Sequence, residues 1–155
     1  AGGLETAGLD HPLAAHVATT AVRMATVDEF LLREGLGAAT VDVLTVDTEG
    51  HDPAVLRGAA RALAAGRVRV LKFENHKLGL WAREKLSGTI RYLDGLGYDC
   101  AWAAKRWLYP ITRCWDARYD RVKQWSNVVC VRRGDPAWGG VLRGLLPDDL
   151  KGILG

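Results

Sequence analysis

Strand-like apolar runs alternate with helix-like segments along most of this chain of 155 residues. Residues 41–47 (VDVLTVD) are apolar or β-branched at most positions, a pattern typical of a strand that is buried on both faces of a parallel sheet. Residues 68–74 (VRVLKFE), 98–102 and 126–132 (SNVVCVR) are three further predicted strands. We therefore expect a sheet of at least these strands.

Helix signals lie before and between the strands. Thr26 and Glu29 have the spacing of a capping box, which predicts a helix that begins there and ends at Gly35. Asp52 precedes a proline and is expected to cap a second helix that ends at Gly66.

A third helix is expected over residues 84–94, with its apolar residues on one face. Alternating strands and helices predict an α/β fold in which helices cover both faces of a mostly parallel sheet.

The composition fits one folded domain, because 48% of the residues are apolar and 25% are charged. We expect the domain over residues 23–133, a loop or frayed end over 1–22, and a tail over 134–155. No uninterrupted apolar stretch has the length of a membrane span, so none is expected.

Charge is distributed unevenly. Residues 1–52 carry nine Asp/Glu against two Lys/Arg, whereas residues 53–155 carry nineteen Lys/Arg against nine Asp/Glu. Eight of these cations lie in residues 101–133, interleaved with aromatic residues, which favours a nucleic-acid or partner-binding module as an alternative function. A folded domain whose acidic loop tips gather at one end explains the same asymmetry, and it makes nucleic acid an unlikely partner.

Residues 103–125 are expected to form a long loop that holds several tryptophans and tyrosines. Such a loop is usually functional or a lid, and the alternative is that its aromatic residues pack on the edge of the sheet.

The three cysteines are Cys100, Cys114 and Cys130, an odd number without a CxxC motif. They indicate reduced thiols in an intracellular, by default cytoplasmic, protein.

Acidic residues and histidines follow two of the predicted strands. Asp47, Glu49 and His51 follow the first, and Glu74 and His76 end the second. In open α/β sheets ligands bind outside the carboxyl ends of the strands, so these side chains are expected at one rim. Their chemistry suits proton transfer or a hard-metal site, although no ligand-spacing motif supports a metal. The alternative is that the carboxylates only cap the following helix and the histidines are solvated.

Residues 26–63 (TVDEFLLREGLGAATVDVLTVDTEGHDPAVLRGAARAL) resemble the central signature of FkbM-type methyltransferases. The family's marked strand-end and helix-start positions are occupied here by Asp47, Glu49, Gly50, Val55, Leu56 and Gly58. Residues 70–76, 93–100 and 126–131 are similar to its later elements, so the resemblance covers about residues 20–133. Thr45 departs from the pattern, since many members carry lysine there.

The resemblance implies a Rossmann-like class I fold and an S-adenosylmethionine-dependent methyltransferase that acts on a hydroxyl oxygen. The chain would supply strands four to seven in the order 4-5-7-6, with strand seven antiparallel. Members bind the cofactor mostly through strands one to three, where a glycine-rich turn follows the first strand. No such turn follows a buried strand here, so cofactor-binding residues stay unassigned and we expect the carboxyl-terminal half of a domain. The strand over 41–47 would then have an open edge for the amino-terminal half or for self-association.

Within this reading, Asp47 is expected to be the general base or to orient the acceptor hydroxyl, and Glu49 is second. Glu74 and His76 would line the rim. Trp107 and Trp115, from the aromatic segment, would cover a small-molecule or glycan acceptor.

Overall fold

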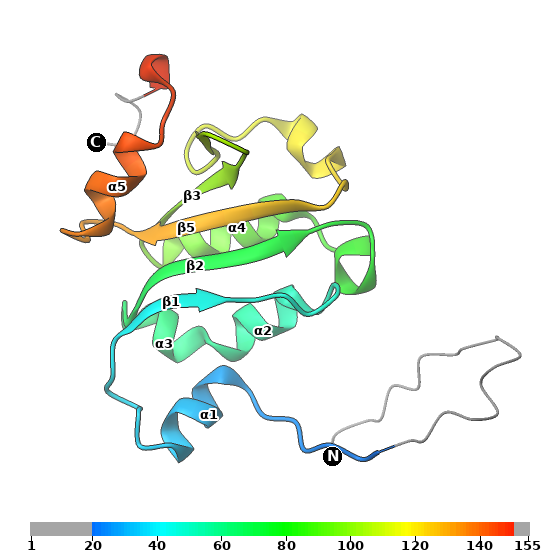
Figure 1. Ribbon diagram of the computed structural model, residues 1–155. Helices are drawn as coiled ribbons and strands as arrows, with labels where there is room; N and C mark the ends of the chain where they lie inside the picture. The colour runs from blue at the N-terminus through cyan, green and yellow to red at the C-terminus, as the bar shows by residue number, and fades with distance from the viewer. Residues whose placement is uncertain (1–19, 151–155) are drawn as a thin grey trace, which may run out of the picture.

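The computed structural model describes residues 20–150, which form a five-stranded mixed sheet (Figure 1). Its order is β1-β2-β5-β3-β4. The strands are β1 (Val41–Thr45), β2 (Val68–Asn75), β3 (Tyr98–Ala103), β4 (Leu108–Pro110) and β5 (Ser126–Arg132). β1 is parallel to β2, whereas β5 is antiparallel to both β2 and β3. The four predicted strands are thus confirmed, as are their order and the antiparallel direction of the last.

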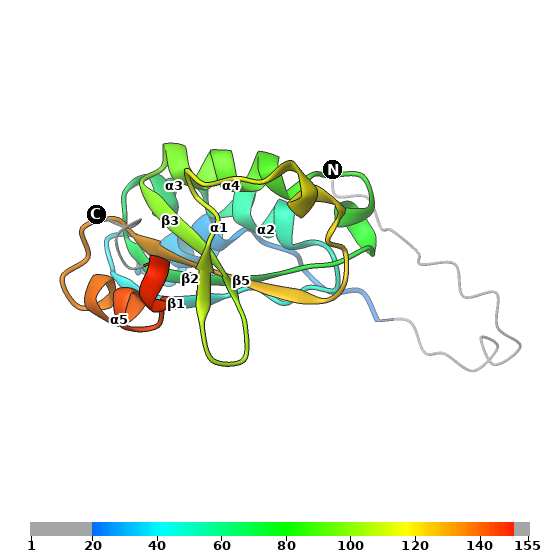
Figure 2. The same cartoon turned by 90° about the horizontal axis from the view of Figure 1, so that it is seen from above.

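Three helices cover one face of the sheet, and a fourth packs beside them (Figures 1 and 2). The covering helices are α2 (Asp52–Gly58), α3 (Ala60–Ala64) and α4 (Leu86–Gly95), and α1 (Val27–Arg33) contacts α2 and α3. On the opposite face α5 (Trp138–Gly144) packs against β5. Three short 3₁₀ helices complete the described chain: η2 (Gly79–Ala82), η3 (Ala117–Arg121) and η4 (Asp148–Leu150).

The main core lies between the sheet and helices α2–α4. Leu71 and Phe73 of β2 are fully buried there, against apolar residues of the helices and the η2 turn: Leu56, Leu63, Trp81, Leu86, Ile90 and Leu93. The phenol of Tyr98 donates a hydrogen bond of 2.6 Å to the carbonyl of Val68, and burial raises the pKa of Tyr98 to about 12. Burial of these side chains removes apolar surface from water, which is the main stabilising contribution to such a fold.

The first and third predicted helices are confirmed. The hydroxyl of Thr26 accepts from the backbone N–H of Glu29 at 3.2 Å, and the Glu29 carboxylate accepts from the N–H of Thr26 at 2.9 Å. These bonds satisfy two of the amides that a helix start leaves open. α1 ends before Gly35, whose φ of 71° suits glycine. α4 occupies the third predicted segment.

The second predicted helix is wrong in one respect, because it is two helices rather than one. The joint lies at Ala59, between α2 and α3. The carboxylate of Asp28 in α1 accepts hydrogen bonds from the backbone N–H groups of Arg61 at 2.8 Å and Ala62 at 3.0 Å. α3 therefore begins with its own cap, supplied by a residue 33 positions away.

The strand over 41–47 was expected to be buried on both faces, and this expectation is wrong. β1 ends at Thr45, and Asp42, Val43 and Thr45 are exposed, with Val43 at 49%. Among the described strands, β1 pairs only with β2 and lies at the edge of the sheet. Among the described helices, α5 covers the second face, and it does so only near β5. Its sequence is that of an interior strand, but its environment is that of an edge strand.

Residues 103–125 are not one long loop, because they contain β4 and η3. Trp115 and Tyr119 pack against the main core and meet edge to face at 5.4 Å. These two side chains therefore pack within the protein, as the alternative to a functional loop predicts.

The predicted end segments are described in part. Residues 1–19 of the expected loop over 1–22, and residues 151–155 of the expected tail, lie outside the described residues. Residues 134–150 hold α5 and η4, and Leu146 is buried with Val70 and Val131 against the second face of the sheet.

The expectation of reduced thiols is wrong for two cysteines. Cys100 of β3 and Cys130 of β5 are directly opposite in the ladder and form a disulfide, while Cys114 is free. The prediction of an intracellular protein rests partly on unpaired cysteines. The disulfide removes that support for Cys100 and Cys130. Among the described helices, none has the length and apolar character needed to cross a membrane.

Candidate functional site

The acidic residues of the two predicted clusters lie at the same edge of the sheet. Because β1 and β2 are parallel, with Thr45 opposite Lys72, their carboxyl ends are adjacent. Neighbouring strands are about 4.8 Å apart. Asp47 and Glu49 follow β1 and are exposed, and Glu74, the second-last residue of β2, is half-buried. The structure therefore brings the three carboxylate residues, Asp47, Glu49 and Glu74, to the carboxyl end of the sheet. We call this end of the sheet the carboxylate edge.

Two glycines hold the loops after β1 and β2 in direct backbone contact. The carbonyl of Gly50 accepts a hydrogen bond from the N–H of Leu80 at 2.9 Å. A Cβ atom on Gly50 would lie 2.5 Å from the carbonyl oxygen of Leu78, and one on Gly79 would lie 2.8 Å from the carbonyl oxygen of Gly50. Both have positive φ, so glycine is required for conformation and for space.

Asp52 is not the helix cap that its position predicts. Its side chain makes no capping bond to α2 and is fully buried. It accepts hydrogen bonds from the backbone N–H of Glu74 and from the hydroxyl of Thr48, each at 3.1 Å. The physical reason is competition for the carboxylate, because the backbone N–H of Glu74 at the end of β2 also offers it a hydrogen bond. Asp52 thus fixes the end of β2 that carries Glu74.

Glu74, His76 and Trp125 form a cluster at the end of β2. The indole N–H of Trp125 donates to Glu74 at 3.1 Å, and the rings of Trp125 and His76 are stacked with centroids 4.7 Å apart. His76 is fully buried, and its Nδ1 accepts from the N–H of Leu78 at 3.1 Å. The alternative that both histidines are solvated is therefore wrong for His76, whereas His51 is exposed.

The two predicted tryptophans lie elsewhere. Trp107 is in the turn between β3 and β4, where its carbonyl accepts from the N–H of Ala104 at 3.0 Å, and Trp115 packs against the core. Trp125 was missed as a site residue. The available signal was its place directly before the strand 126–132, since an antiparallel partner of β2 begins where β2 ends.

Half of the cations in residues 101–133 are engaged within the protein. Arg113 and Arg133 pair with Asp99 at 2.9 Å each, and Arg118 pairs with Asp116. Lys123 donates to two backbone carbonyls, and burial lowers its pKa. These contacts reduce the charge that the segment offers to a phosphate backbone.

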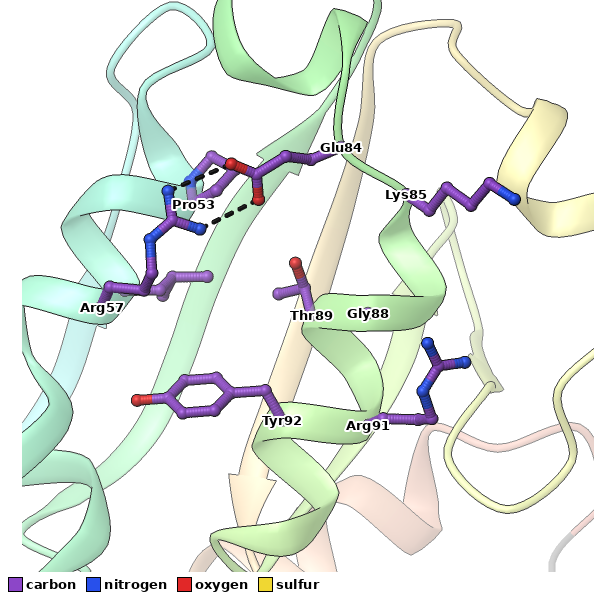
Figure 3. Close-up of a pocket in the computed structure, with 9 residues that line it drawn as sticks. Pro53, Arg57, Glu84, Lys85, Gly88, Thr89, Arg91 and Tyr92 are labelled. Carbon is purple, nitrogen blue, oxygen red and sulfur yellow. Dashed lines mark hydrogen bonds and ion pairs between the residues drawn. The ribbon is translucent and has the colours of Figure 1, made fainter.

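A cavity of about 380 Å³ lies on the helical side of the protein, along α2 and α4 (Figure 3). Arg57 and Glu84 bridge it with two hydrogen bonds of 2.9 and 3.0 Å. The hydroxyl of Tyr92 is buried there and has no hydrogen-bond partner within residues 20–150, and burial raises its pKa. None of the predicted site residues lines this cavity.

Comparison with protein-family models matched one family, described as the methyltransferase FkbM domain, over residues 4–100. The chain belongs to this family. Its match includes the segment of residues 26–63 on which the resemblance rests and ends within β3. Comparisons with curated proteins and with solved structures found no match.

Membership in the FkbM family indicates that the protein is a methyltransferase. Within residues 20–150, no three His, Cys, Asp or Glu side chains are grouped as metal ligands. Carboxylates such as Asp47, Glu49 and Glu74 are groups that can accept a proton.

Proposed function

We propose that this FkbM domain takes part in S-adenosylmethionine-dependent methyl transfer to a hydroxyl oxygen, as the carboxyl-terminal part of a Rossmann-like class I methyltransferase fold. The observation that carries the proposal is the position of Asp47, Glu49 and Glu74 at the carboxyl edge of a sheet whose chain matches the FkbM family. The strand order, with an antiparallel strand between two parallel ones, supports the same fold.

Asp47 is the proposed general base, or the group that orients the acceptor hydroxyl. It is exposed, so an acceptor can reach its carboxylate, and it lies two residues after Thr45, the last residue of the regular strand β1. A base that accepts the hydroxyl proton raises the nucleophilicity of the oxygen. Glu49 is the second candidate, and Glu74 and His76 line the rim.

We infer that residues 20–150 do not hold the methyl donor by themselves. A Cβ atom on Gly50, the glycine that follows β1, would lie 2.5 Å from the carbonyl oxygen of Leu78, so no ligand atom can occupy that side of its backbone. We therefore propose that donor binding is supplied by a further part of the domain, which is not among these 155 residues. The free edge of β1, where Val43 is 49% exposed, is the proposed place where the donor-binding part of the domain pairs.

The role of Asp47 is tested by Asp47→Asn in a protein that includes the donor-binding part. Turnover is expected to fall by about 10²- to 10⁴-fold, the usual contribution of a general base, while the dissociation constant of S-adenosylmethionine stays unchanged. Asp149→Asn, an exposed carboxylate in η4, is the control. Unchanged turnover in Asp47→Asn removes this residue from the chemistry.

Donor binding is tested separately by calorimetric titration of S-adenosylmethionine into the chain of 155 residues. We expect no heat of binding. Measurable binding would show that the donor site lies within this chain. It would contradict the proposal that a separate donor-binding part pairs with β1.

A further inference from the structure

Trp125 presents an open aromatic ring face at the carboxylate edge. One face of its indole is stacked on His76 at an interplanar angle of 16°, and its N–H is bonded to Glu74. The residue is nevertheless 54% exposed. The exposed part therefore consists mainly of the ring face opposite His76 and the adjoining edge.

His76 makes this platform rigid. Its Nδ1 accepts a backbone hydrogen bond from Leu78, and its buried Nε2 has no partner among the described residues. A fully buried ring held by a backbone hydrogen bond restricts the movement of the indole that is stacked on it. A preorganised aromatic face binds a ligand with little loss of side-chain entropy.

We propose that Trp125 is the stacking platform for the methyl acceptor and that the acceptor is a neutral cyclic polyol, a sugar-type ring. This inference rests on the proposed function for the identity of the ligand as acceptor. The apolar C–H face of such a ring packs on the indole, as saturated and aromatic surfaces do in protein cores. Its hydroxyl groups then donate to carboxylates at the same edge, beginning with Glu74, which already holds the indole N–H.

Charge at the edge selects against other ring-bearing ligands. Asp47, Glu49 and Glu74 are carboxylates, so the phosphate of a nucleotide stacked on Trp125 would be repelled. An acyl chain would remove these carboxylates from water without offering a hydrogen bond in return. A ligand rich in hydroxyl donors and without charge satisfies both conditions.

The test is a titration followed by the ¹H–¹⁵N resonance of the Trp125 indole in the full chain, assigned by its loss in Trp125→Phe. The probes are the methyl glycopyranosides of glucose, galactose, mannose and fucose. Mannitol serves as the open-chain polyol and AMP as the nucleotide. We expect at least one glycoside to shift this resonance with a lower dissociation constant than mannitol or AMP.

Variants separate stacking from general binding. Trp125→Ala is expected to weaken glycoside binding by about tenfold or more, which is measured by the resonances of residues near Glu74. Trp125→Phe is expected to weaken it by less, because a benzene ring keeps the stacking face. Phe30→Ala removes an exposed aromatic ring of α1 and should leave binding unchanged. No response to any glycoside, an equal response to mannitol, tighter binding of AMP, or unchanged binding in Trp125→Ala would each overturn the inference.

The inference and the proposed function fail separately. Glycoside binding without turnover in the donor-competent protein contradicts methyl transfer but leaves the platform. Turnover of an open-chain alcohol without glycoside binding contradicts the platform but leaves the proposed function.

Discussion

The carboxylate of Asp52 accepts a hydrogen bond from the backbone N–H of Glu74 at 3.1 Å, which ties the start of α2 to the end of β2. The second carboxylate oxygen accepts from the hydroxyl of Thr48. Asp52 is fully buried, so water does not compete for its carboxylate oxygens. This one side chain therefore connects the loop after β1, which carries Asp47, with the strand that carries Glu74.

Removing that carboxylate should destabilise the protein. In Asp52→Ala the N–H of Glu74 loses a buried partner, which costs about 1–3 kcal/mol of unfolding free energy. Asp52→Asn should cost less, because its amide oxygen can still accept from Glu74. Urea unfolding measures both, with Asp149→Asn on the surface as the control. Equal stability of Asp52→Ala and the control would show that this hydrogen bond contributes nothing.

The contact between Gly50 and the backbone at Leu78 should tolerate no side chain. Gly50→Ala places a methyl group 2.5 Å from a carbonyl oxygen at a φ of 99°, so we expect a loss of more than about 1 kcal/mol. Gly88→Ala is the matched control, because Gly88 lies within α4 and a Cβ there meets no atom within 4 Å. That variant should be neutral or more stable by up to about 1 kcal/mol. Equal effects in urea unfolding would contradict the close contact.

Features determined by a few neighbouring residues could be predicted from the sequence. The capping box of Thr26 and Glu29 needs only a spacing of three residues, and the strand over 126–132 is visible in its own apolar pattern. The strand order came instead from the resemblance to the FkbM family, because pairing of distant strands leaves no local signal.

Features that depend on tertiary contacts were predicted wrongly or missed. Asp52 has the sequence of a helix cap, but the amide it binds comes from β2, 22 residues later. Cys100 and Cys130 have an unremarkable spacing until β3 and β5 pair and set them opposite each other. Trp125 reaches Glu74 across 51 positions, which no periodicity reveals.

The disulfide predicts one free thiol in the unfolded, non-reduced protein, that of Cys114. A thiol assay in denaturant should therefore count one thiol before reduction and three after it. The bridge joins residues 30 positions apart, for which the loop-entropy model gives about 3–4 kcal/mol. Cys100→Ala/Cys130→Ala should accordingly lower the melting temperature, whereas Cys114→Ala should not. Three thiols without reductant would show that the pair is not oxidised.

Asp135 should make stability depend on pH in acid. It accepts two hydrogen bonds from Arg69, at 2.8 and 3.0 Å, and two from backbone N–H groups that follow it. These bonds, above all those from Arg69, hold the pKa of Asp135 well below its usual value. In the unfolded chain an aspartate has a pKa of about 3.9.

The sign follows from linkage, because a carboxylate whose pKa is lower in the folded state stabilises the protein fully above the unfolded value. That contribution decreases as the pH falls below about 4 towards the folded pKa. Asp135→Asn should therefore be less stable than the parent at pH 7, and the difference should shrink steadily between about pH 5 and pH 2. Urea unfolding at several pH values measures it, with Asp149→Asn as the exposed control. A difference that stays constant over this range would mean that Asp135 contributes through packing and not through its charge on Arg69.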